Sequence, residues 1–182
     1  MFLDNLLLPK TGTCFNIRQL KEPDFDDFYT LSSDANLKQF MGGAVTLPRK
    51  QWIAGMKKNQ FYSEYLAIKM KPDSCFAGFA SFNHFLKGPE ISNTFFEFQI
   101  LIAKLYQKQG LGTEISNILI AAAFHELKAE RIYAVVDPQN QSSIKMFSKL
   151  GFKPEGEVNR IEEWQHGHKI FALASKTHRV AS

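Results

Sequence analysis

The spacing of apolar residues changes abruptly at Gly110. Before this residue, short segments rich in aromatic and β-branched residues alternate with turn residues, a pattern typical of antiparallel strands. The strands predicted there are 64–70, 75–85 and 93–102, with turns at 72–73 and 88–89. After it, apolar residues recur at a helical spacing over 112–127. The chain therefore combines a meander of strands with a helix that begins at a glycine-rich turn.

Start signals such as proline, aspartate and asparagine predict three further helices. These are 24–33, 48–58 and 140–150; further strands are predicted at 13–20, 131–136 and twice within 152–175, and 34–47 is expected to be irregular. The segment 93–136 forms a strand–helix–strand unit, for which a right-handed parallel connection is expected. The order predicts a single domain over 1–182 of the α/β (α+β) class. Its central sheet should be mixed, mostly antiparallel, of about seven strands and flanked by helices.

Composition and charge narrow the function classes. The formal charge of +4 and the pI near 9.0 fit a phosphate-rich ligand. Lys and Arg form no dense run, so nucleic-acid binding is the weakest alternative. Cys14 and Cys75 fit no metal-ligand spacing and are expected to be free thiols. The sequence shows no signal peptide and no bilayer-length apolar run, so we expect a cytoplasmic protein without a membrane partner.

Residues 107–113, Gln-Lys-Gln-Gly-Leu-Gly-Thr, lie between a predicted strand and a predicted helix. A helix start leaves several backbone N–H groups without partners and carries partial positive charge. Glycines let an anion approach the backbone closely, and Lys104 and Lys108 add charge. These features predict a pyrophosphate site, with a plain glycine-rich turn as the alternative. A P-loop needs Gly-Lys-Ser/Thr and a dinucleotide fingerprint needs a third glycine, and this chain has neither.

A second motif covers residues 137–152, Asp-Pro-Gln-Asn-Gln-Ser-Ser-Ile-Lys-Met-Phe-Ser-Lys-Leu-Gly-Phe. By itself it predicts a helix capped by Asn140 that packs on a core. At this separation, the two motifs resemble the Gcn5-related N-acetyltransferase (GNAT) superfamily, which has Gln/Arg-x-x-Gly-x-Gly/Ala and Asn-x-x-Ala/Ser signatures. The resemblance is strongest over 93–156. The Gly42-Gly43 pair, Glu97 and the Asp-Pro-x-Asn run are similar to the RimJ/RimL-type branch.

The resemblance implies an acyl-CoA N-acyltransferase fold, acetyl-CoA as co-substrate and an amine as acceptor. The sequence leaves both a monomer and a homodimer open. The coenzyme pyrophosphate is expected at the amides of 109–113. Its pantetheine arm is expected beside the backbone of 100–102, where two strands splay apart, with Asn140 on the other side of the arm. The coenzyme-binding residues expected in this way are Ile100, Leu101, Ile102, Gln107, Lys108, Gln109, Gly110, Leu111, Gly112, Thr113, Asn140, Ser143 and Phe147. No metal is expected, because His166 and His168 lack further ligands.

An amine attacks a thioester only in its unprotonated form, so the implied reaction favours a general base. Strand alternation puts Phe95, Glu97 and Gln99 on one face of the sheet. Apolar neighbours there would raise the pKa of Glu97 toward neutrality. Since the family places a base on this strand, often acting through water, Glu97 is the predicted base. A glutamate on an exposed sheet surface is the alternative.

The predicted general acid is less well defined. Many family members carry a tyrosine where this chain has Phe147, which has no hydroxyl to protonate a thiolate. Ser143 matches the serine of the RimL-type pattern and is the candidate donor to the sulfur, with Tyr106 in reserve. A first-turn serine without a role is the alternative, and a non-catalytic acyl-CoA sensor stays open as a second function. The loop 160–168 and the segment 31–47 are expected to form opposite walls of the acceptor site.

Overall fold

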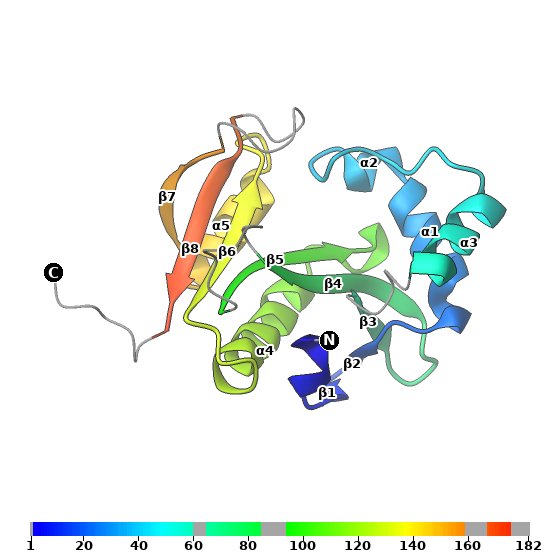
Figure 1. The fold of residues 1–182 in the computed structure, drawn as a ribbon, viewed down its shortest axis with the longest axis horizontal. Coiled ribbons are helices and arrows are strands. Elements are labelled where there is room, and N and C mark those ends of the chain that lie inside the picture. The colour runs from blue at the N-terminus through cyan, green and yellow to red at the C-terminus, as the bar shows by residue number, and fades with distance from the viewer. Residues whose placement is uncertain (1, 60–64, 85–93, 159–166, 176–182) are drawn as a thin grey trace, which may run out of the picture. The chain divides into compact units, whose positions relative to one another are not determined.

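A computed structural model describes residues 2–59, 65–84, 94–158 and 167–175 (Figure 1). The predicted turn at 88–89 and most of the loop 160–168 lie outside these residues. The strands are β1 (Lys10–Thr11), β2 (Phe15–Gln19), β3 (Tyr65–Met70), β4 (Phe76–His84), β5 (Phe95–Ile102), β6 (Arg131–Val136), β7 (Lys153–Glu157) and β8 (Lys169–Ala174). The helices are α1 (Phe25–Ser33), α2 (Ala35–Lys38), α3 (Arg49–Asn59), α4 (Leu111–His125) and α5 (Gln141–Lys149), with 3-10 turns η1 (Phe2–Asn5), η2 (Glu22–Asp24) and η4 (Lys104–Tyr106).

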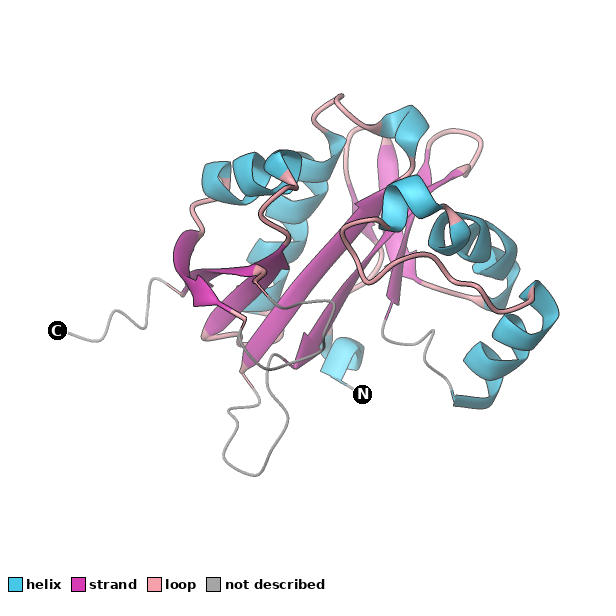
Figure 2. Cartoon of the chain, turned by 90° about the horizontal axis from the view of Figure 1, so that it is seen from above, coloured by secondary structure: helices cyan, strands magenta, loops and turns pink. Residues whose placement is uncertain are grey.

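The strands form one eight-stranded sheet in the order β1-β2-β3-β4-β5-β6-β8-β7, flanked by helices (Figure 2). β5 and β6 run parallel, joined through α4, whereas β1–β2, β2–β3, β3–β4, β6–β8 and β7–β8 are antiparallel. The predicted mixed, mostly antiparallel sheet is therefore confirmed. The strand beyond the predicted seven is β1, whose two residues pair with β2.

The segment 34–47 was expected to be irregular, and this is wrong for the four residues of α2. The Asp34 side chain caps this helix by accepting the N–H groups of Asn36 at 2.8 Å and Leu37 at 3.2 Å. The cap explains the difference, because an aspartate that binds two free amides can start a helix too short to show an apolar period.

The contacts within the chain divide it into two compact units. The N-terminal unit comprises Leu7–Ser81 and Ile100–Glu114, and the C-terminal unit comprises Met1–Leu6, Phe82–Gln99 and Ile115–Ser182. The division falls within β4, β5 and α4, so these three elements contribute residues to both units. The single domain over 1–182 stays a prediction.

The core of the N-terminal unit is built around Phe28 of α1. Its ring contacts Trp52 of α3 at 5.3 Å and, from the strands, Tyr65 at 4.9 Å and Phe79 at 4.7 Å between centroids. Phe25, one helical turn earlier, is buried in the same cluster. Burying side chains of this size contributes about 2–3 kcal/mol each, which holds α1 and α3 against β3 and β4.

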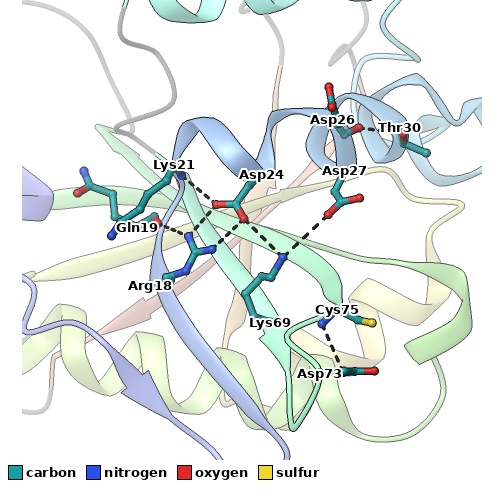
Figure 3. Close-up of polar contacts among 10 residues, drawn as sticks. All are labelled: Arg18, Gln19, Lys21, Asp24, Asp26, Asp27, Thr30, Lys69, Asp73 and Cys75. Atoms are coloured by element: carbon teal, nitrogen blue, oxygen red, sulfur yellow. Dashed lines mark hydrogen bonds and ion pairs between the residues drawn. The ribbon is translucent and has the colours of Figure 1, made fainter.

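A buried carboxylate fixes the start of α1 on the sheet (Figure 3). Asp24 is only 2% exposed, and Arg18 of β2 donates to both of its oxygens, at 2.7 and 2.8 Å. Lys69 of β3 lies 3.5 Å from the same carboxylate, and the Lys21 amide donates to it at 3.0 Å. Burial alone would raise the pKa of Asp24, but these hydrogen bonds and positive charges outweigh it and hold the pKa below its usual value.

The core of the C-terminal unit lies on one face of its strands. Phe98 of β5 contacts Phe147 of α5 at 6.4 Å, and Phe147 contacts Phe152 at 5.1 Å between centroids. α5 begins at the predicted cap, where Asn140 Oδ1 accepts the Ser143 N–H at 3.1 Å, and stops before Gly151, which has a φ of 90°. This face of β5 is therefore filled by aromatic rings.

Candidate active site

A short loop connects β5 and η4 to the start of α4. Residues 107–110 are exposed, and the loop contains two residues in the left-handed region, Lys108 at φ 61° and Gly110 at φ 81°. Gln107 and Gln109 fix its course, because their side-chain amides donate to the carbonyls of Ile102 at 2.8 Å and Leu105 at 2.9 Å. A lysine in the left-handed region costs about 1–2 kcal/mol, so the loop holds an unfavourable shape that its hydrogen bonds maintain.

The loop ends at a helix start with free amides. Gly110 O accepts the N–H groups of Thr113 and Glu114, both at 3.1 Å, so these two amides are used within the first turn. The preceding amides, Leu111 and Gly112, have no backbone acceptor among the described residues. A Cβ added at Gly110 would meet nothing within 4 Å, so the space beside the turn is open. Free amides, the helix dipole and open space together suit an anion.

β5 extends beyond the residues that pair with β6. The parallel register covers only three residue pairs, Phe95–Arg131, Phe96–Ile132 and Glu97–Tyr133. Both strands continue beyond these pairs, β5 to Ile102 and β6 to Val136. Within the C-terminal unit, the described residues of β5 that follow Glu97 therefore have no partner on β6. Strand backbone without a neighbour can pair with a ligand that carries amides.

The far end of β5 is held from its other edge. The Ala103 amide donates to Ala77 O of β4 at 2.8 Å. Gly78 lies so close to this stretch that an added Cβ would come 2.1 Å from Leu101 O. Only glycine fits there, so the backbone of 100–102 has a fixed position in the N-terminal unit.

Glu97 lies on the face of β5 opposite the aromatic core. Gln99 donates from Nε2 to Glu97 Oε1 at 3.0 Å, which places both side chains on one face, as alternation predicts. The register partner of Glu97 on β6 is Tyr133, which is buried. Burial raises the pKa of Glu97, and the hydrogen bond from Gln99 opposes this only in part. The expected direction of the shift is present, and the carboxylate can accept a proton closer to neutral pH than an exposed glutamate can.

The start of α5 presents Asn140 and Ser143, both partly buried. Asn140 Oδ1 is used by the helix cap, so its amide nitrogen is the group left to donate to a ligand. Phe147 is 5% exposed and packs between Phe98 and Phe152, where it contributes to the core. Its predicted role in coenzyme binding stays a prediction.

A comparison with known families decides what kind of chain this is. The sequence profile of the family described as acetyltransferase (GNAT) domain matches residues 15–153. This match covers both motifs and most of both units. The chain belongs to the GNAT acetyltransferase family.

The relatives of this GNAT chain include curated proteins matched by sequence and solved structures with the same fold. Spermidine N(1)-acetyltransferase of Escherichia coli K12 is 39% identical over 62 residues, 34% of this chain and 33% of that protein. This match thus spans about a third of the length of the curated relative. Spermidine N-acetyltransferase from Vibrio cholerae, solved with CoA and spermine, has a TM-score of 0.73 at 16% identity, covering 90% of this chain and 96% of that one. Ribosomal-protein-S5-alanine acetyltransferase from Vibrio fischeri has a TM-score of 0.74 at 16% identity, covering 93% and 97%.

The structure of the GNAT chain adds contacts that the sequence did not predict. Alternation places Gln99 beside Glu97, but the hydrogen bond between them is visible only in the structure. Arg131 pairs with Glu155 and lies 5.7 Å from the centroid of the Tyr133 ring. Tyr106 interacts with Cys75, and burial together with the nearby Cys75 and Asp73 raises its pKa. This higher pKa weakens Tyr106 as a reserve acid.

The predicted acceptor loop is described only at its end. Arg160, Glu162, Glu163, Trp164 and His166 lie outside the described residues. His168 is buried, with Nε2 3.9 Å from Asp137 Oδ2. The described part of the chain contains no group of three or more His, Cys, Asp or Glu side chains arranged to hold a metal ion. None of its helices has the length and apolarity needed to cross a membrane.

Proposed function

We propose that this chain is an acetyl-CoA-dependent N-acetyltransferase that moves the acetyl group onto a primary amine by direct attack. The observation that carries the proposal is the end of the β5–β6 pairing at Glu97. The β5 backbone that lacks a β6 partner begins directly after Glu97, and the carboxylate of Glu97 has a raised pKa. Membership of the GNAT family and the open helix start at Leu111 support the same assignment.

Two backbone surfaces are proposed to bind the coenzyme. The amides of Leu111 and Gly112 would receive the pyrophosphate, assisted by those of Gln109 and Gly110, because the Thr113 amide is already used by Gly110 O. The backbone of 100–102 would pair with the amides of the pantetheine arm. Neither surface depends on a side chain for its hydrogen bonds, which fits a ligand recognised mainly through backbone groups.

The chemistry assigns one proton transfer to Glu97. At pH 7 an α-amine is about 10% unprotonated and a lysine-type amine below about 0.1%, at free-energy costs of roughly 1.4 and 4.6 kcal/mol. Glu97 would take the ammonium proton, directly or through a water. The free amine nitrogen then bonds to the thioester carbonyl carbon, the carbon–sulfur bond breaks, and the electron pair leaves on sulfur. The nitrogen loses its second proton in this step, and the departing thiolate takes up a proton to give the free thiol of CoA. No covalent enzyme intermediate is needed when both substrates are held together.

The departing thiolate needs little help, since a thiol has a pKa of about 8.5. Ser143 is proposed as a hydrogen-bond donor to the sulfur, because it lies in the first turn of α5 and is only partly buried. Phe147 has no hydroxyl and cannot take this role. The acceptor is proposed as a primary amine of a polyamine or of a peptide N-terminus. The relatives named for spermidine and for ribosomal protein S5 support both, and the second supports the RimJ/RimL-type branch.

Coenzyme binding is tested with a pair of glycine variants. Gly110 and Gly43 have φ values of 81° and 83°, and an added Cβ meets nothing within 4 Å at either. Alanine therefore costs both sites a similar backbone strain, of about 1–2 kcal/mol. Calorimetric titration with CoA should show binding about 10-fold weaker in Gly110→Ala, equivalent to about 1.4 kcal/mol, and unchanged in Gly43→Ala. Equal affinity in the two variants would contradict the assignment of the loop.

Turnover is tested by thiol release from acetyl-CoA over a panel of peptides with free N-termini, polyamines and aminoglycosides. Release that depends on one amine class would support the enzyme and identify its acceptor class. Tight CoA binding without release for any amine would instead favour the non-catalytic sensor. Absence of CoA binding by the unmodified protein would refute both.

A further inference from the structure

Glu97 is held by a neutral neighbour from its own strand. Gln99 Nε2 donates to Glu97 Oε1 at 3.0 Å, and the other carboxylate oxygen, Oε2, is not used by this bond. Phe96 and Phe98, which alternate with these two residues along β5, point to the opposite face of the strand. Their rings contact the ring of Phe82 at 6.4 and 5.0 Å between centroids. The pair therefore belongs to the face of β5 that the aromatic core leaves free.

The described titratable groups beside this pair lie on β4 and β6. On β6, Tyr133 is the register partner of Glu97, and burial raises the pKa of its hydroxyl, so it is neutral at physiological pH. Arg131, two residues away on the same strand, is paired with Glu155 of β7. On β4, His84 lies on the opposite face, where its ring stacks on Phe96 at 5.2 Å. Among the described side chains of the C-terminal unit, the hydrogen bond to Glu97 thus comes from an uncharged amide.

A neutral donor is well suited to a carboxylate that must exchange a proton. A cation at 3.0 Å would hold the carboxylate ionised and make it a poor base, whereas burial without any donor would keep it protonated. The Gln99 amide, a neutral donor, leaves the carboxylate between these two cases, so that it can both lose and gain a proton. It also fixes the rotation of the carboxylate by binding one oxygen, which leaves the other to receive the proton.

We propose that Gln99 is a positioning residue for the acetyl transfer: by donating to Oε1 it orients the Glu97 carboxylate so that Oε2 accepts the proton of the acceptor amine or of a bridging water. This inference rests on the proposed function in its last step only. The hydrogen bond and its effect on the carboxylate can be measured in the protein without any substrate.

The test uses Gln99→Met, which keeps the length of the side chain and removes the donor, and Gln99→Glu, which replaces the donor with a second carboxylate. Gln51→Met, on the exposed surface of α3, is the matched control. The Glu97 carboxyl carbon is titrated by ¹³C NMR in protein labelled at glutamate, with the signal assigned by its loss in Glu97→Gln. The pH profile of kcat/KM is measured on the same variants.

We expect the NMR midpoint of Glu97 to rise by about 1–2 pH units in Gln99→Met, because a hydrogen bond to a charged group is lost. A larger rise is expected in Gln99→Glu, where two carboxylates compete for one proton. The acid limb of the kcat/KM profile should move by the same amount, with activity recovering at high pH. Gln51→Met should change neither quantity.

Other outcomes overturn the proposal in distinguishable ways. An unchanged NMR midpoint in Gln99→Met would show that Gln99 does not act on the carboxylate at all. A moved midpoint with an unmoved acid limb would show that the pair exists but takes no part in catalysis. A loss of kcat/KM that is equal at every pH would indicate a structural role alone. If the unmodified protein acetylates no amine, the proposed function fails, and a moved midpoint still supports the interaction between Gln99 and Glu97.

Discussion

Two enclosed carboxylates of this chain, Asp24 in the N-terminal unit and Glu97 in the C-terminal unit, have pKa shifts of opposite sign. Asp24 is only 2% exposed, yet its pKa lies below its usual value. Glu97 is partly buried, and its pKa is raised. Loss of water therefore does not by itself decide the direction of the shift, because it acts on both carboxylates.

The partners of the two carboxylates explain the difference. Asp24 receives two hydrogen bonds from Arg18 and faces Lys69, so cations compensate the loss of water. Glu97 receives one hydrogen bond from a neutral amide, which compensates it only in part. A carboxylate locked in its ionised form ties elements together, whereas one that can gain and lose a proton can act as a base. We propose from this contrast that Asp24 stabilises the fold and that Glu97 acts as the base.

The largest expected effect comes from Glu97→Gln. This substitution keeps the shape and removes the proposed base, so kcat in the thiol-release assay should fall by about 100-fold or more. The dissociation constant of CoA should be unchanged, because Glu97 is not among the groups proposed to contact the coenzyme. Glu157→Gln, the same change on exposed β7, should leave kcat unaltered. Equal losses of turnover and coenzyme affinity in Glu97→Gln would break the contrast.

Glu97→Gln also predicts a stability effect of defined sign. Because the folded-state pKa of Glu97 is raised, the ionised carboxylate costs stability as pH rises through that pKa. Glutamine removes this cost. The free energy of unfolding at pH 8 should therefore be equal to or above that of the unmodified protein, and a clear decrease would mean that the carboxylate is structural.

The sequence predicts the position and the direction of the pKa shift of Glu97, but it does not predict the partners of Asp24. Strand alternation placed Glu97 on the face away from Phe96 and Phe98, because alternation is a local property of the backbone. The partners of Asp24 are Arg18 and Lys69, six and 45 residues away in the sequence. No local period indicates which cations meet a carboxylate across a fold, so this cluster was visible only in the structure.

Helices and strands show the same difference between local signals, which the sequence reveals, and contacts between distant residues, which it does not. β6 has the bounds predicted from its apolar run, and α5 starts at the predicted cap, since both signals are local. β1, with two residues, carries no pattern of its own and depends on its pairing with β2. The end of the β5–β6 register at Glu97 is likewise a property of two strands together. The resemblance to the family, and not the residue pattern, led to the expectation of a splay near 100–102.

The second largest effect is expected for Asp24→Asn. Asparagine keeps the shape but leaves Arg18 and Lys69 without the charge that holds them, so the free energy of unfolding should fall by about 2–4 kcal/mol. Urea denaturation at neutral pH measures this loss. Asp26→Asn is the matched control, because the ion pair of Asp26 with Arg49 is exposed and worth at most about 1 kcal/mol. Similar losses in both variants would remove the special role of Asp24.

The smallest effect, and the sharpest test of the contrast, is the order in which activity and the native fold are lost as pH decreases. The pKa of Glu97 lies above the usual value of about 4.3, so kcat/KM should fall first as pH decreases. The stability due to Asp24 is present above about pH 3.9 and is lost only as pH falls through its lowered folded-state pKa. Activity should therefore disappear while tryptophan fluorescence is still native, and it should return on neutralisation. Loss of activity and native fluorescence together, at one pH, would mean that the two carboxylates do not act separately.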